Sequence, residues 1–115
     1  MCRMAHQYVY GGGAMKIIMK LCDMIEEEIA DAHKYIECAL EKKEEDKSLA
    51  DMFYKLSLGE IEHMNMLHKQ AVEKIDAARK EKTPPAYMLE FYNYLHKKHI
   101  EKAKEVKILQ AMYES

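Results

Sequence analysis

Residues 21–39 read LCDMIEEEIADAHKYIECA, and this stretch decides the fold class. Its apolar side chains recur every three or four positions, which is the spacing of one face of an α-helix. The stripe consists of Leu21, Ile25, Ala32, Tyr35 and Ala39. The same spacing continues in both directions and predicts a helix over about residues 16–43.

Two further helices are expected downstream. The polar run at residues 41–47 predicts a turn, and Ser48 with Asp51 three residues later is typical of a capping box that opens a helix over about residues 48–80. Pro84 and Pro85 end that helix, because a proline inside a helix removes a backbone hydrogen bond. A third helix is expected over about residues 85–113. The stripe of the second helix contains Leu49, Phe53, Leu56, Met64, Leu67, Ala71 and Ala78, and that of the third contains Met88, Tyr92, Leu95, His99, Ala103, Val106 and Tyr113.

The connections between these helices are short, which predicts an all-α, antiparallel three-helix bundle. The 115 residues suit one domain. We expect residues 1–14, with their glycine run, to be a flexible N-terminal extension and residues 15–115 to form the helical domain. Because a four-helix core would need a further helix, we expect a homodimer or higher homo-oligomer that completes the core or a metal site.

Composition narrows the function classes. The net charge is −2 with interspersed signs, so the basic footprint of a nucleic-acid binder is missing from the sequence. No apolar run approaches the roughly 20 residues that span a bilayer, and we expect no membrane role. Three cysteines without a CxxC pair argue against a disulfide framework and favour a reducing cytoplasm.

Two glutamates break the apolar pattern. Glu28 lies in the middle of the first stripe and Glu60 in the middle of the second, so both are expected to face the core. A buried carboxylate normally becomes neutral, pairs with a cation or binds a metal, because burying an unpaired charge is costly. Two such residues call for a common explanation.

A third polar residue joins them. An antiparallel turn near residue 46 places Glu28 level with both Glu60 and His63. Glu60 and His63 form a Glu-x-x-His motif, the arrangement that binds carboxylate-bridged metal pairs in helical bundles. The sequence therefore predicts a metal site made by Glu28, Glu60 and His63. Two carboxylates and one imidazole suit iron or manganese, with zinc as a further alternative.

These residues also resemble a known family. Residues 24–70 resemble half of a ferritin-like, rubrerythrin-type di-iron domain: Glu28-Ile-Ala-Asp-Ala-His-Lys-Tyr35 is similar to its first-helix motif and Glu60-Ile-Glu-His63 to its second-helix motif. The resemblance implies a di-iron site in which Glu28 is a terminal ligand, Glu60 bridges the ions and His63 completes the coordination shell. It also implies oxidoreductase chemistry of the ferroxidase or peroxidase type, in which Fe(II) is oxidised by oxygen or peroxide.

The chain departs from that family in its second half. It contains neither a second Glu-x-x-His nor a fourth helix, and it lacks the cysteine pairs of a rubredoxin-like module. His99 and Glu105 in the third helix are further ligand candidates. Alternatively, two chains pair their ligand sets across a twofold axis, as in the encapsulated ferritins that this chain resembles in motif count. We favour the dimeric site.

A second function remains open. Glu28, Glu60 and His63 can form a buried polar network, with a structural metal or none, in a small helical self-associating interaction or structural protein. The remaining histidines are expected at the surface or at helix flanks, and Cys22 and Cys38 are expected to be ordinary thiols. The flank and surface histidines are His6, His33, His68 and His96.

Overall fold

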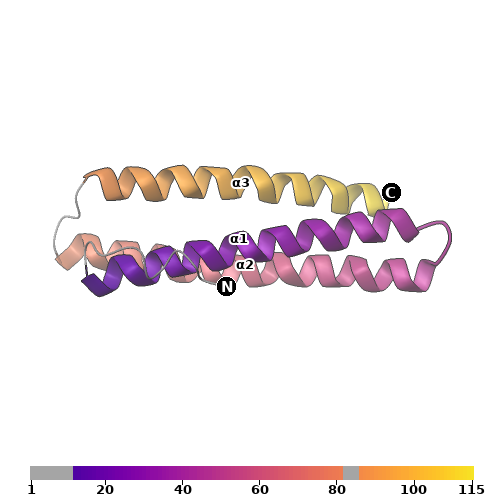
Figure 1. Cartoon of the computed structure of the whole chain (residues 1–115), viewed down its shortest axis with the longest axis horizontal. Helices are drawn as coiled ribbons and strands as arrows, with labels where there is room; N and C mark the ends of the chain where they lie inside the picture. Colours follow the sequence, from indigo (N-terminus) through magenta and orange to yellow (C-terminus); the bar gives the residue numbers. More distant parts are fainter. Residues whose placement is uncertain (1–11, 82–85) are drawn as a thin grey trace.

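The computed structural model describes residues 12–81 and 86–115. These residues form three helices: α1 (Gly12–Lys42), α2 (Lys47–Glu81) and α3 (Ala86–Glu114). In Figure 1, α1 and α2 lie side by side and are joined by a short turn, and α3 runs back along them. The expected all-α, largely antiparallel three-helix arrangement is confirmed.

The first helix begins earlier than the sequence indicates. It starts at Gly12 and so takes in three residues of the expected N-terminal extension, although glycine is a poor helix former. Residues 1–11 of that extension lie outside the described part of the chain.

The start of α2 differs from the expected capping box. The amide of Leu49 donates a hydrogen bond of 3.1 Å to Asp46 Oδ1, so Asp46 is the capping residue and Ser48 belongs to the first helical turn. An aspartate directly before a helix can accept a hydrogen bond from the amide of the third helical residue, and Asp46 caps α2 in this way. Asp51 instead accepts hydrogen bonds from Lys47 Nζ and from the hydroxyl of Tyr113.

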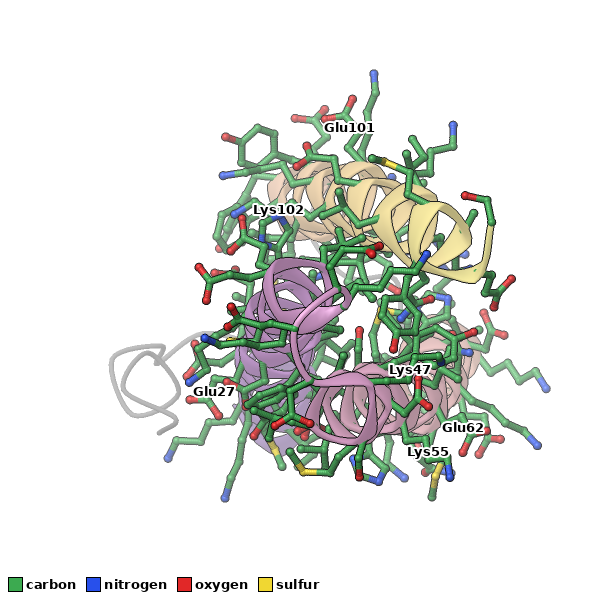
Figure 2. All side chains as sticks on the ribbon, turned by 90° about the vertical axis from the view of Figure 1, so that its right-hand side faces the viewer. Glu27, Lys47, Lys55, Glu62, Glu101 and Lys102 are labelled. Carbon is green, nitrogen blue, oxygen red and sulfur yellow. The ribbon has the colours of Figure 1, made fainter. Side chains whose placement is uncertain are left out.

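The core follows α1, which packs against both other helices, whereas α2 and α3 barely touch each other. The expected inward face of α3 is confirmed, with all seven of its residues buried. At the middle level the core consists of Ile25, Ile29, Ala32, Ile61, Met64, Ala103 and Val106. Charged side chains such as Lys55, Glu62 and Glu101 extend outward, as Figure 2 shows.

The expected core face of α2 is partly wrong. Leu49 and Leu56 are exposed, although both lie on the predicted stripe. Because α3 packs on α1 and scarcely on α2, the flank of α2 on which these leucines lie stays partly open. None of the three helices, over the residues described, is long and apolar enough to cross a membrane.

A buried polar connection links all three helices. The hydroxyl of Ser57 on α2 donates to the carbonyl oxygen of Ala32 on α1 at 2.8 Å. The side-chain amide of Gln110 on α3 donates to Ser57 Oγ at 2.9 Å. Both side chains are almost fully buried, so these bonds specify how the helices align along their axes.

Replacing Ser57 with alanine (Ser57→Ala) should lower the free energy of unfolding by about 1–3 kcal/mol, because the buried amide of Gln110 loses its acceptor. Urea denaturation followed by circular dichroism measures the change. The matched control, Ser57→Ala combined with Gln110→Leu, removes both polar groups and should recover much of the loss. A double variant less stable than the single one would contradict this account.

Candidate metal centre

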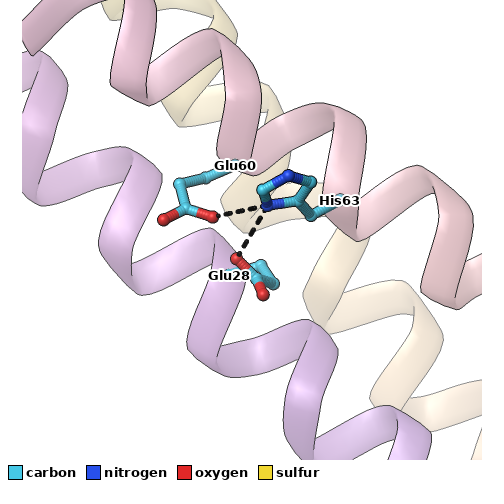
Figure 3. Close-up of side chains that lie close together, drawn as sticks. All are labelled: Glu28, Glu60 and His63. Carbon is cyan, nitrogen blue, oxygen red and sulfur yellow. Dashed lines mark hydrogen bonds and ion pairs between the residues drawn. The ribbon is translucent and has the colours of Figure 1, made fainter.

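Glu28, Glu60 and His63 come together at the contact between α1 and α2. Glu28 lies near the middle of α1, while Glu60 and His63 lie three residues apart on α2 and therefore share one side of that helix. The antiparallel turn places the three side chains at one level, and Figure 3 shows them pointing toward one another. The sequence predicts that Glu28 lies level with Glu60 and His63 along the helices, and the structure agrees.

The distances are short enough for one ion. His63 Nδ1 lies 3.0 Å from Glu60 Oε1 and 3.8 Å from Glu28 Oε1. One ligand atom from each residue lies within 4.8 Å of the others. Bonds from zinc to carboxylate oxygen and imidazole nitrogen are about 2.0–2.2 Å, so small side-chain rotations would place the three atoms around an ion of this size.

The group is more open than the sequence suggests. The side chains of Glu28 and Glu60 are 26% and 18% exposed and that of His63 is 59% exposed. The buried face of α1 includes Ile29 and Ile36. Glu28 therefore lies at the edge of this buried face and not at its centre. In Figure 3, α3 runs behind α1 and α2, and the three side chains lie on the side that α3 does not cover.

The electrostatics show two carboxylates competing for one proton. The pKa of Glu28 rises to about 7, chiefly because its protonated form hydrogen bonds to Glu60, and further because of partial burial and the charge of Glu60. The pKa of His63 is also raised, mainly by its hydrogen bond to Glu60. The site therefore attracts positive charge, either as protons or as a cation.

Two weaker candidates lie elsewhere. His99 is buried at the centre of the inward face of α3, and its Nε2 lies 3.5 Å from Glu26 Oε2 rather than near Glu28. Glu105 is exposed on α3. Among the described residues, neither belongs to the Glu28, Glu60 and His63 group.

The surrounding side chains have structural roles. The ring of Tyr35 stacks on that of Phe53 at 6.3 Å between centroids. Burial, with smaller contributions from Glu26 and Asp23, raises the pKa of Cys22 to about 12, so this thiol stays neutral at physiological pH.

Sequence reasoning did not predict one grouping of histidines. His68 and His96 are half-buried, as expected for helix flanks, and both line a pocket between α2 and α3 that also includes His99. The three-residue spacing of His96 and His99 is the sequence signal that places them on adjoining positions of one helix.

The metal-free protein should lose stability as pH rises. A folded-state pKa of about 7 for Glu28, against 4.5 for an ordinary glutamate, means that the folded chain holds a proton that the unfolded chain has released between those values. The contribution of Glu28 to stability therefore falls between about pH 4.5 and pH 7 and stays lost above that range.

Glu28→Gln tests this dependence, because glutamine does not ionise. We expect the unfolding free energy of Glu28→Gln relative to the unaltered protein to increase from pH 5 to pH 8, measured by urea denaturation with a chelator present. Parallel pH profiles for the two proteins would show that Glu28 has an ordinary pKa.

Comparison of the chain with models of known protein families, with curated proteins and with solved structures gives no match. The case for a function therefore depends on the chemistry of the residues that the fold brings together.

Proposed function

We propose that Glu28, Glu60 and His63 bind a transition-metal ion, with iron preferred, and that the chain is a ferritin-like protein oxidising Fe(II) with oxygen or peroxide. One observation carries the proposal: three potential ligand atoms from two helices lie within 4.8 Å of one another. The chemistry of the donors and the resemblance to the rubrerythrin-type motif support the choice of reaction.

The donor set favours iron. Two carboxylate oxygens and one imidazole nitrogen are ligands for Fe(II), Mn(II) and Zn(II), and the absence of a nearby thiolate ligand among the described residues disfavours copper(I) and iron–sulfur chemistry. Carboxylates stabilise the higher charge of Fe(III), which lowers the cost of oxidation. Manganese or zinc would bind through the same atoms without the same tendency to be oxidised by oxygen.

The three residues supply only part of a coordination shell, and the exposed face beside them suggests what completes it. Apolar side chains follow α2 at alternating spacings of three and four, as in a coiled-coil seam. Leu49, Met52 and Leu56 are 36%, 42% and 41% exposed. The same spacing continues through Gly59 to His63, so the candidate metal ligand lies on the apolar stripe.

We infer that a second copy of the chain packs on this face, which we call the α2 stripe and define by Leu49, Met52, Leu56, Gly59 and His63. Two α1–α2 pairs would then form a four-helix bundle with α3 on each outer side. A Cβ at Gly59 would meet no atom within 4 Å, so this position leaves room for a close helix approach. Twofold pairing brings two ligand sets together and provides sites for two ions.

The reaction balances with two iron ions. Oxidation of two Fe(II) ions to Fe(III) releases two electrons, which with two protons reduce one O₂ to H₂O₂, or one H₂O₂ to two H₂O. Any proton held by Glu28 or His63 is released when a cation enters, since the ligand forms of both are deprotonated.

An alternative follows from the contacts among the ligands themselves. The ion pair of His63 with Glu28 can hold α1 against α2 without metal, and the α2 stripe can serve self-association alone. Under this view the protein is a helical interaction or structural protein whose association survives chelation.

Anaerobic titration with Fe(II), followed by an air pulse monitored by ferric absorbance, tests the metal site. We expect one iron per chain and rapid oxidation. Glu60→Gln should weaken Fe(II) binding by more than about 100-fold. Losing a residue that only hydrogen bonds to a metal ligand costs about 10- to 100-fold in affinity, and losing a ligand itself should cost more. Glu62→Gln is the matched control, because Glu62 is exposed on the same helix and points outward (Figure 2). Equal binding by both variants would refute the ligand assignment.

The α2 stripe is tested by Leu56→Lys. A charge in the dimer contact should shift the protein to a monomer in analytical ultracentrifugation, because burying an unpaired lysine is costly, and should slow ferric formation. The control is Ile108→Lys, an equally large change on an exposed position of α3. If the unaltered protein is a monomer, or if both variants stay dimeric, the α2 stripe is not the contact.

A further inference from the structure

A pocket of about 420 Å³ lies between α2 and α3, away from the Glu28, Glu60 and His63 group. It exists because α2 and α3 barely touch and α1 forms the base on which both pack. Ile25 of α1, Met64 of α2 and Ala103 of α3 line it, so all three helices contribute apolar surface. The exposed side chains of Asn65 and Ile100 also line it, which shows that it opens to solvent. Its size falls in the range of small-molecule sites.

The ionisable residues that line this pocket are all basic. Five of its residues carry a lysine or histidine side chain, and among the described lining residues there is no aspartate or glutamate. This bias is notable in a chain whose net charge is −2. The five residues are His68 on α2 and His96, His99, Lys104 and Lys107 on α3.

The histidines are held in place but incompletely satisfied. His68 and His96 stack with centroids 4.6 Å apart and planes within 4°, and Tyr92 extends the stack beyond His96 at 5.9 Å. His99 is 6% exposed, and its Nε2 has no hydrogen-bond partner among the described residues. Glu26 Oε2 lies 3.5 Å away, an ion-pair distance only if the ring is protonated. Buried polar atoms are usually paired, so the unsatisfied nitrogen needs an explanation.

Burial favours the neutral form of two of these rings. The pKa of His68 is lowered by burial and by the nearby His96. The pKa of His99 is lowered chiefly by burial and also by His96 and Lys102, against the opposing effect of Glu26. The groups that face these rings are therefore Glu26 from α1, His68 from α2, and His96, Lys102, Lys104 and Lys107 from α3.

We propose that this pocket binds a small organic anion, a carboxylate with an apolar body. The anionic group lies among the histidines and the lysines, and the apolar body packs on Ile25, Met64 and Ala103. A metal ion fits the histidine pair less well, because the lone pairs of two parallel rings do not converge on one point. The pocket is separate from the proposed iron site, so this inference does not depend on that function.

Benzoate is the probe, since it combines a carboxylate with an apolar ring. Its binding is followed by the ¹H–¹⁵N resonances of the histidine rings in the 115-residue chain. We expect benzoate to shift the resonances of His68, His96 and His99 while that of His63 stays in place. Benzyl alcohol, which has the ring without the charge, and inorganic phosphate, which has the charge without the ring, should each bind more weakly. Absence of shifts with benzoate, or equal affinity for benzyl alcohol, overturns the proposal.

Two double variants with equal charge changes locate the site. Lys104→Gln with Lys107→Gln should weaken benzoate binding by roughly 2- to 30-fold, the loss expected for two partly solvated charge contacts. Lys97→Gln with Lys98→Gln changes exposed lysines outside the pocket lining and should leave affinity unchanged. Equal weakening by both pairs would mean that only the net charge matters and would overturn the assignment.

The pH dependence gives an independent readout. An anion stabilises the protonated imidazoles, so binding should take up protons and be tighter at pH 6 than at pH 8. Calorimetry in buffers of different ionisation enthalpy measures the proton uptake. Binding that is independent of pH, with no proton uptake, would show that the histidines do not contact the anion.

Discussion

The alignment of α1 against α2 is the constraint on which the site depends. The hydrogen bond from Ser57 to the carbonyl of Ala32 fixes that alignment, and the candidate ligands lie one turn away on each helix: Glu28 precedes Ala32 by four residues, and Glu60 follows Ser57 by three. A slip of one helical turn would displace one helix by about 5.4 Å and separate Glu28 from His63. The buried polar pair thus orients the site without being part of it.

The placement of α3 explains why the molecule has two unlike open faces. Because α3 packs on α1 and scarcely on α2, α2 is left with uncovered positions on both flanks. On one flank the uncovered residues are apolar and lie in line with His63, which suits a partner helix. On the other flank α2 contributes His68, and α3 contributes His96, His99 and two lysines, above an apolar base, which suits a small anion. A fourth helix within the chain would remove at least one of these faces.

Sequence periodicity predicted what depends on one helix and missed what depends on the distances between helices. The inward face of α3 and the grouping of Glu28 with Glu60 and His63 follow from spacing and chain direction alone. The exposure of Leu56 and the pocket beside His68 depend on how far α2 lies from α3, which no single-helix pattern contains. The cap at Asp46 was missed because Ser48 offers an equally plausible motif two residues later, and only backbone geometry decides between them.

The composition of the site favours a metal over a structural network. A network that only stabilised the helix contact would pair each carboxylate with a lysine or arginine, yet no such ion pair with Glu28 or Glu60 occurs among the described residues. Instead the two glutamates face each other and hold the pKa of Glu28 at about 7, which costs stability whenever both are ionised. A bound cation removes that repulsion, and a ligand present at 100 times its dissociation constant stabilises the folded state by about 2.7 kcal/mol. The paired carboxylates thus destabilise the folded chain without a cation and stabilise it with one. A metal-binding role accounts for this arrangement.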